Sequence, residues 1–443
     1  MFSTKITKPP DVTYHNEAMN TKYIFKTIAF SIFFISTWSY SQGNFDFEKA
    51  LRIDFVLSGD KQEQTATIAN YLKTPNYFDS PEQSIPDFDY GSYRIVLTSS
   101  ANRDTLYIKG FCTLFEEWRA TPGAKQKKRA FKQTVETPFP LQKVIINLEF
   151  REKNGKFTSL LSEEFSPESL ITKLIPTKFP SRIIHGTAAP SKKLDLLVLA
   201  EGYTREETET FFNDAEKMVS ELFKTPPYDR LKNKITVRAM AVSSAESGTD
   251  DPVKDEWKNT AMESTFNTFG TDRYLESLST WKIYDYAAAH PRDHIIVLVN
   301  TKKYGGGGVY NHFSITSAGH SQSAKVLIHE IGHGLAGLGD EYYSSEVTYS
   351  GFFDLDTEPW HPNITTLVDF DSKWKNLLED SILIPTPAKH KYKNITGVFE
   401  GAGYTAKGIY RPAFNCRMKS NEAAGFCEVC RLSIENIVNF YTH

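Results

Sequence analysis

The sequence predicts an all-β sandwich domain followed by a mixed α/β (α+β) domain. Three observations predict this division. The chain has 443 residues, which is enough for two or three domains. From Phe45 to about Phe165, apolar residues mostly alternate with polar ones, as in strands. From residue 194 onward, continuous apolar runs are separated by segments of helical period, which indicates a different class.

The first domain, which we place at residues 44–175, contains four strand candidates separated by turn-rich stretches. They are residues 50–58 (ALRIDFVLS), 93–100 (YRIVLTSS), 105–115 (TLYIKGFCTLF) and 143–150 (KVIINLEF). Each alternates or runs apolar, and no long helical segment separates them. An antiparallel β-sandwich fits this pattern best. We find no combination of residue types in it that would indicate catalysis.

A linker is expected at residues 176–193, where prolines and small residues accumulate. The second domain, at 194–443, opens with the apolar run LDLLVLAEGY (194–203), which is typical of a buried parallel strand. A helix should follow from Thr204, which caps it, to about Phe223.

Further along the second domain, strands are expected at 234–244 and 293–300, with helical pattern between them. A loop-rich segment from 343 to about 412 precedes a short terminal helix at 428–441. Strands that alternate with helices indicate an α/β sheet.

Composition narrows the functional classes. A hydrophobic content of 40% and a charged content of 24% are those of an ordinary globular protein. The formal net charge of −3 argues against a nucleic-acid partner, because such proteins carry a basic surface. We expect a monomer.

The N-terminus has the pattern of a secretory signal peptide. Two lysines precede an apolar core at residues 28–38, and the small-x-small sequence SYS ends at residue 41. The core is too short to span a membrane. We expect residues 1–41 to be removed on export, with residues 1–18 translated from a start upstream of the true one, Met19. The mature chain would then be secreted, periplasmic or on the cell surface.

Cysteines are few, and three of the four fall close together. Cys112 stands alone, whereas Cys416, Cys427 and Cys430 lie near the C-terminus. Because an exported protein can form disulfides, the pattern favours one disulfide among these three with one thiol left over. A structural zinc ion on the three thiolates is the alternative, although no fourth ligand is evident nearby.

The segment KVLIHEIGHGLAGLGDEYY (325–343) has the pattern of a metal site. His329 and His333 are four residues apart, so in a helix both project from one face and can bind a single Zn²⁺. Glu330 can then reach a zinc-bound water as a general base. Two histidines buried in an ordinary core are the alternative. The glycine-rich end of the helix and the acidic pair after it favour the metal site.

Other segments of the second domain occur in a characteristic order with this one. They are LVLAEGYT (197–204), SSAESGTDDP (243–252), FGTDR (269–273), EPWHPNIT (358–365) and FEGAGYTAKGIYRP (399–412), the last leading into CRMKS and FCEVC. Together with HEIGHGLAGLGDEY, they resemble the immunoglobulin A peptidase family of secreted zinc metalloendopeptidases, which is related to the metzincins. The resemblance covers about residues 195–430 and, less specifically, the β-rich region. It implies a metzincin-like domain, one catalytic Zn²⁺ and a protein or peptide substrate.

The metzincin pattern also suggests a third zinc ligand. It places a glycine three residues after the second histidine and a ligand six residues after it, but Ala336 and Gly339 stand there. One position further along are Gly337 and Asp340. The resemblance therefore implies Asp340, in place of the usual histidine, with the spacing lengthened by one residue.

Alternatives to Asp340 are Glu341 and a downstream glutamate such as Glu346 or Glu358. The Asp-Glu pair could otherwise form a solvated turn or a structural Ca²⁺ site.

The segment NCRMKS (415–420) resembles the Met-turn, in which a methionine packs beneath the zinc-binding histidines. Met418 is the candidate, and a methionine that fills an ordinary core gap is the alternative. The tyrosine that follows this turn in many metzincins is missing. Tyr404, Tyr410 and Arg411 are candidates for stabilising the oxyanion or binding substrate.

A run of glycines from Gly305 to Gly308 precedes VYNHFSIT (309–316). In a metzincin arrangement this strand is a sheet edge that pairs with extended substrate. A flexible loop without a catalytic role is the alternative.

These observations predict an exported zinc metalloendopeptidase that hydrolyses extracellular proteins, with Glu330 assisting the attack of zinc-bound water. Two other functions remain open. One is a non-catalytic surface adhesin or binding protein with the same fold, and the other is a zinc amidase of cell-wall peptides.

Overall fold

The computed structural model describes residues 43–75, 84–169, 171–187, 192–343 and 351–442. The predicted signal peptide at 1–41 lies outside these residues. In the described part of the chain, no helix has the length and apolar character needed to cross a membrane.

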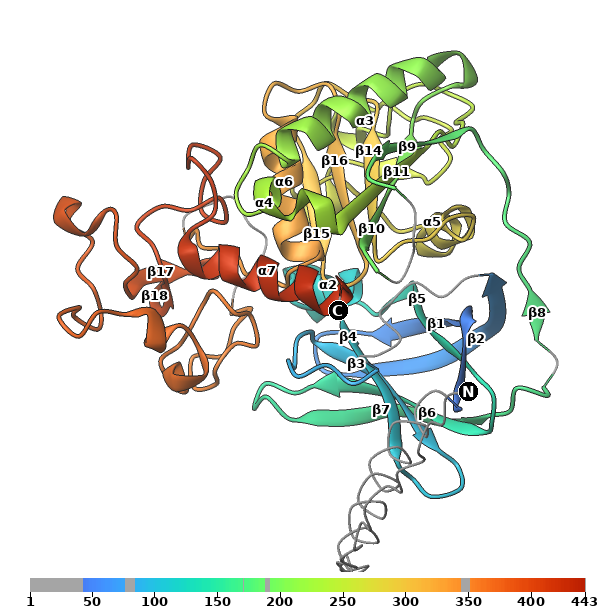
Figure 1. Cartoon of the computed structure of the whole chain (residues 1–443), viewed down its shortest axis with the longest axis horizontal. Coiled ribbons are helices and arrows are strands. Elements are labelled where there is room, and N and C mark those ends of the chain that lie inside the picture. Colours follow the sequence, from blue (N-terminus) through green and yellow to red (C-terminus); the bar gives the residue numbers. More distant parts are fainter. Residues whose placement is uncertain (1–42, 76–83, 170, 188–191, 344–350, 443) are drawn as a thin grey trace, which may run out of the picture. The chain divides into compact units, whose positions relative to one another are not determined.

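Two four-stranded sheets form the N-terminal region (Figure 1). One has the order β5-β1-β2-β8, with β1 Phe45–Gly59, β2 Gln64–Pro75, β5 Arg129–Pro140 and β8 Thr172–Lys173. The other has the order β4-β3-β6-β7, with β3 Tyr93–Ser99, β4 Thr105–Phe111, β6 Val144–Arg151 and β7 Phe157–Phe165. Apolar residues of β1, β3 and β6 lie in one buried cluster, so the two sheets share a core. The prediction of an N-terminal region built mainly of β-sheets is confirmed.

A short helix departs from the predicted pattern of this region. The expected strand at 105–115 ends at Phe111, and α2 (Leu114–Arg119) follows it. Thr113 begins this helix, because its hydroxyl accepts a hydrogen bond from the backbone N–H of Glu116 at 3.2 Å.

A six-stranded mixed sheet organises the second region, in the order β15-β16-β14-β10-β11-β9. Its strands are β9 Ser181–His185, β10 Leu194–Glu201, β11 Ile235–Met240, β14 His294–Val299, β15 Gly306–Val309 and β16 Phe313–Ser317. The four central strands are parallel, and the two edge strands are antiparallel to their neighbours. Strand β9 lies within residues 176–193, which were predicted to be a linker.

Helices cover both faces of this sheet, which confirms the mixed α/β class. On one face, α3 (Thr208–Leu222), α6 (Ser323–Gly334) and α7 (Glu428–Thr442) share a buried cluster with β10 and β11. On the other, α5 (Thr280–Ala287) packs against Leu197 and Leu199 of β10. This alternation along β10 explains its continuous apolar run, because both faces of the strand are buried.

Smaller elements complete the described chain. They are α4 Tyr228–Leu231, β12 Ser264–Thr265, β13 Glu276–Ser277, β17 Phe399–Ala402 and β18 Thr405–Arg411, with 3₁₀ helices at 122–125, 205–207, 232–234, 252–254, 268–270, 370–372, 375–377 and 390–392. The hairpin β17–β18 lies in the segment that the sequence predicted to be loop-rich.

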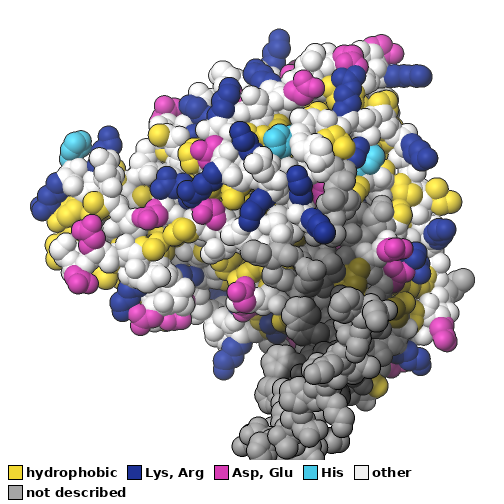
Figure 2. All heavy atoms as spheres, in the orientation of Figure 1, with side chains coloured by type: hydrophobic (Ala, Val, Ile, Leu, Met, Phe, Trp, Pro, Cys, Tyr) yellow, Lys and Arg dark blue, Asp and Glu magenta, His cyan; other side chains and the backbone are white. Residues whose placement is uncertain are grey.

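A partly buried ion pair joins the two regions. Arg52 of β1 is almost fully buried, and its guanidinium donates to Asp54 at 2.8 Å and to Asp285 of α5 at 2.7 Å. This ion pair is one contact between the β-sheets and the second region. On the face seen in Figure 2, acidic and basic side chains are interspersed.

Candidate metal centre

Helix α6 presents two chemically different sides. Val326, Leu327 and Ile331 are buried, and Leu327 and Ile331 lie in the core beneath the sheet. His329 and His333, one turn apart, lie instead on the wall of a cavity. The i, i+4 spacing therefore places both imidazoles on the same side, as the sequence predicted.

A tight turn after α6 brings Asp340 back to the histidines. Gly337 adopts a left-handed conformation with φ of +63°, and a Cβ there would lie 2.9 Å from the Trp360 ring. Its N–H donates to the His333 carbonyl at 3.1 Å, which ends the helix in the way that glycine permits. Asp340 Oδ1 then lies 3.1 Å from His329 Nε2 and 3.3 Å from His333 Nε2.

The three ligand atoms fit one metal ion. The two Nε2 atoms are 3.0 Å apart, so all three separations lie between 3.0 and 3.3 Å. A tetrahedral zinc ion at about 2.0–2.1 Å from nitrogen and oxygen ligands would separate them by about 3.3–3.4 Å. Two imidazoles and one carboxylate are also a donor set that catalytic zinc accepts.

Backbone carbonyls orient both rings. His329 Nδ1–H donates to the Arg417 carbonyl at 3.0 Å, and His333 Nδ1–H donates to the Leu338 carbonyl at 2.6 Å. With Nδ1 held in this way, Nε2 of each ring faces the point where the three ligand atoms converge. This is the usual outer support of a metal-binding histidine.

Electrostatics favour positive charge at that point. Burial would lower the pKa of His333, but the facing Asp340 carboxylate overrides this effect and raises it to about 9. Burial would raise the pKa of Asp340, but His333 and His329 hold it well below its usual range. Asp340 is only 5% exposed, and its Oδ2 accepts a hydrogen bond from the Tyr404 hydroxyl at 2.6 Å. The carboxylate is therefore ionised and held in place.

The cavity beside these ligands has a volume of about 750 Å³. Both regions of the molecule contribute to its wall, which includes Arg119 and Arg151 from the N-terminal region and Glu330 from α6. Burial raises the pKa of Glu330. Glu330 lies next to His329 in the sequence and on the same cavity wall. A small molecule in the cavity can therefore contact both side chains.

Strand β15 forms another part of the wall through its glycines. A Cβ on Gly306 would lie 2.6 Å from the Val326 side chain, and one on Gly308 would lie 2.4 Å from the Glu330 carbonyl. Glycine thus permits the strand to approach α6 closely. Gly306 forms an isolated bridge with Tyr274 on the side away from β16, so the outer edge of β15 is partly paired.

Met418 lies beneath the helix between the two histidines. It is fully buried, and a Cβ on Gly332 would lie 2.7 Å from its sulfur. Its carbonyl accepts a hydrogen bond from the Glu341 N–H at 2.8 Å. The methionine therefore contacts the helix of the histidines and the loop of Asp340.

Other residues singled out in the sequence lie elsewhere. Tyr404 lines the cavity, but Tyr410 and Arg411 do not. The Arg411 guanidinium is buried and donates to the backbone carbonyl of Glu400 at 2.7 Å. Glu358 lines the cavity, but its Oε2 accepts from the Asp369 N–H at 3.0 Å, outside the ligand cluster. Glu346 lies outside the described residues.

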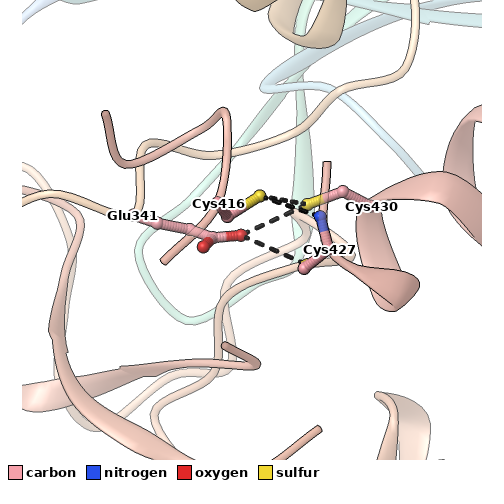
Figure 3. A group of neighbouring side chains, drawn as sticks. All are labelled: Glu341, Cys416, Cys427 and Cys430. Carbon is pink, nitrogen blue, oxygen red and sulfur yellow. Dashed lines mark hydrogen bonds between the residues drawn. The ribbon is translucent and has the colours of Figure 1, made fainter. Parts of the chain in front are cut away.

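Glu341 directly follows Asp340, but its side chain lies in a second cluster. Its carboxylate lies with Cys416, Cys427 and Cys430, and their ligand atoms are all within 4.8 Å of one another (Figure 3). The solvated turn considered for the acidic pair is wrong, because both residues are buried. A Ca²⁺ site on this pair is also disfavoured, since Glu341 lies among sulfur atoms.

The disulfide predicted among these cysteines is not formed. All three are free cysteines, and the sulfurs of Cys416 and Cys430 are 3.7 Å apart. A disulfide requires about 2.05 Å.

Sequence reasoning overlooked three residues of the site. The rings of Trp360 and His361 stack at 3.7 Å and line the cavity, and burial keeps the pKa of His361 well below its usual value. Asn363 is fully buried and forms two hydrogen bonds with the backbone of Gly339, at 2.7 and 2.9 Å. All three belong to EPWHPNIT, which showed the resemblance without indicating individual roles.

Comparison with known families identifies the family of this chain. The model of the family described as IgA Peptidase M64 matches residues 183–396 and 388–438, and the model described as Peptidase M64 N-terminus matches residues 43–162. No curated protein matches the chain. The first family model alone spans more than half of the sequence, and the second covers most of the β-rich region. The chain therefore belongs to the IgA peptidase M64 family and is a peptidase.

Proposed function

We propose that the protein is an exported, zinc-dependent metalloendopeptidase with a metzincin-like catalytic domain. The observation that carries this proposal is the convergence of His329 Nε2, His333 Nε2 and Asp340 Oδ1 on one point of a cavity wall. Membership of a peptidase family supports it. Export rests on the signal-peptide pattern at residues 1–41, and it makes extracellular proteins the expected substrates.

In this proposal His329, His333 and Asp340 would hold a zinc ion at the cavity wall. Three protein ligands with an open fourth position are characteristic of catalytic zinc. A zinc ion bound there would supply a Lewis acid for the substrate carbonyl and the attacking water.

Glu330 is the proposed general base. Its carboxylate takes a proton from the attacking water and then delivers it to the nitrogen of the leaving amine. The proposed role of Tyr404 is to hold Oδ2 of Asp340, so that Oδ1 faces the ion. This is a positioning role, and it differs from the oxyanion role that the sequence suggested.

The proposed substrate is an extended peptide. Strand β15 lacks side chains at Gly306, Gly307 and Gly308, and these residues line the cavity beside Glu330. Backbone groups in such a position can hydrogen-bond to an extended chain without regard to its sequence. The stacked rings of Trp360 and His361 provide a flat wall for one substrate side chain.

The test is proteolysis of denatured casein by the wild-type protein and by Glu330→Gln. The variant keeps the shape of the side chain but cannot accept the proton, so activity should fall by about 10²–10⁴-fold while zinc content is unchanged. A chelator should abolish wild-type activity, and added zinc should restore it. Glu358→Gln, at another glutamate on the cavity wall, is the matched control and should keep most activity.

Near-normal activity of Glu330→Gln would overturn the mechanism. Cleavage of cell-wall peptides without cleavage of casein would favour the amidase, and binding without any hydrolysis would favour the adhesin.

A further inference from the structure

A second group of side chains that could bind a metal ion does not line the cavity, and the proposed peptidase mechanism does not use it. Glu341, Cys416, Cys427 and Cys430 come from three separate segments, and their side chains converge (Figure 3). We propose that these four residues bind a structural Zn²⁺ ion. This inference goes beyond the proposed function, because the ion would take no part in the reaction.

The distances within the cluster fit tetrahedral coordination. Cys416 Sγ and Cys430 Sγ are 3.7 Å apart, and Glu341 Oε1 lies 3.2 Å from Cys430 Sγ and 3.9 Å from Cys427 Sγ. Zinc–sulfur bonds of about 2.3 Å and a zinc–oxygen bond of about 2.0 Å would separate two sulfurs by about 3.8 Å, and sulfur from oxygen by about 3.5 Å. A disulfide in place of the ion would require two sulfurs at about 2.05 Å.

Glu341 provides an independent argument for a cation. Its side chain is fully buried (0% exposed), and its Oε2 has no hydrogen-bond partner among the described residues. Burying a carboxylate with an unpartnered oxygen is unfavourable unless a charge or a metal ion compensates it. Asn363 Nδ2 donates to Oε1 at 3.0 Å, which orients the carboxylate toward the sulfurs.

The local chain around the cysteines is also suited to a thiolate site. Cys427 and Cys430 have the Cys-x-x-Cys spacing that recurs in structural zinc sites, and Cys430 lies in the first turn of α7. The backbone N–H of Cys427 donates to Cys416 Sγ at 3.3 Å. Three thiolates, one carboxylate and Zn²⁺ sum to a charge of about −2. Neighbouring cations offset this negative charge. Arg411 and Lys419 attract Glu341 electrostatically, and Arg417 attracts Cys416.

An ion here would tie together the segments that build the cavity wall. Glu341 follows Asp340 directly, Cys416 precedes Met418 by two residues, and Cys430 belongs to the terminal helix. The N–H of Glu341 already donates to the Met418 carbonyl. The structural ion would thus position Asp340 without contacting substrate.

The first experiment uses the unaltered full-length protein, so it does not depend on any variant folding. Zinc per chain is measured together with zinc X-ray absorption, and thiols are counted after denaturation in a chelator. Two zinc equivalents, sulfur scattering from part of the zinc and four free thiols are expected. A single equivalent with only nitrogen and oxygen neighbours, or two thiols missing as a disulfide, would overturn the proposal.

Variants then locate the second ion. Cys427→Ser alters the most accessible cysteine of the cluster, and it should lose the sulfur-bound equivalent and the cobalt–thiolate absorption of the cobalt-substituted protein. Cys112→Ser removes a thiol outside the cluster and should keep both. Equal zinc and equal thiolate absorption in the two variants would contradict the assignment. Because Glu330→Gln should keep both ions, failure of the peptidase mechanism is distinguishable from failure of this site.

Discussion

Asp340 and Glu341 are neighbours in the chain, yet they belong to two clusters of opposite character. The first cluster, His329, His333 and Asp340, has three ligand residues and lines the cavity. The second has four ligand residues, Glu341 with three cysteines, and none of them lines the cavity. Catalytic zinc sites keep one position open, whereas structural sites are closed by four protein ligands. Ligand number and access to the cavity thus favour a catalytic ion at the first cluster and a structural ion at the second, as proposed above.

The largest expected effect comes from a substitution of Asp340 that leaves its neighbour Glu341 unchanged. Asp340→Ala should remove the ion at the cavity, because two histidines form an incomplete site. Activity should then fall at least as far as it does on loss of the general base, which is about 10²–10⁴-fold. The sulfur-bound ion should remain, and the cobalt–thiolate absorption would report it.

Glu341→Ala is the matched variant, one residue away. It should weaken the sulfur-bound ion and keep the ion at the cavity, with an activity loss on the order of 10–100-fold at most, as for residues that support a ligand. Metal content and casein cleavage of both proteins decide the comparison. If Glu341→Ala empties the cavity site while Asp340→Ala keeps it loaded, the ligand assignment is wrong by one residue.

The sequence predicted the two clusters to very different extents. The spacing of His329 and His333 is local, so a helical pattern was enough to place both on one side of α6. Asp340 came from a resemblance that had to be lengthened by one residue, and the left-handed turn at Gly337 provides the physical reason for that register. Glu341 could not be connected to Cys416, because a tertiary contact between residues 341 and 416 is invisible to local periodicity.

The fold shows the same dependence on local signals. Strands β1 and β10 could be predicted because their sequences contain long apolar runs, and the structure buries these runs. Strands β2 and β7 were missed, since each has only one buried residue, Thr74 and Phe165, and therefore no apolar run that signals a strand. Strands β5 and β9 were also missed, and β9 lies among the prolines and small residues that suggested a linker.

A smaller effect should come from the support of the cavity ligand. Tyr404→Phe removes the hydroxyl that donates to Asp340 Oδ2, so the carboxylate loses its orientation. Loss of such a partner typically reduces metal affinity or activity by about 10–100-fold. Competition with a zinc chelator measures the affinity, and the sulfur-bound ion should be unaffected.

Tyr410→Phe is the control for this variant. It alters a tyrosine in the adjoining strand β18 that does not line the cavity. If both variants lower zinc affinity equally, the hairpin contributes through its general stability, and the specific role of the Tyr404 hydroxyl would be rejected.

The smallest expected effect joins the two clusters instead of separating them. In Gly332→Ala, the new Cβ would lie 2.7 Å from the sulfur of the fully buried Met418, which must move. Overpacking of this kind costs about 1–3 kcal/mol of unfolding free energy, and the better helix propensity of alanine offsets about 1 kcal/mol. Gly425→Ala, whose Cβ would meet no atom within 4 Å, is the control.

Because the Met418 carbonyl accepts a hydrogen bond from the Glu341 N–H, displacement of Met418 should weaken the binding of both ions together. Chelator competition followed at both sites tests this coupling, and a loss confined to one site would show that Met418 does not connect them.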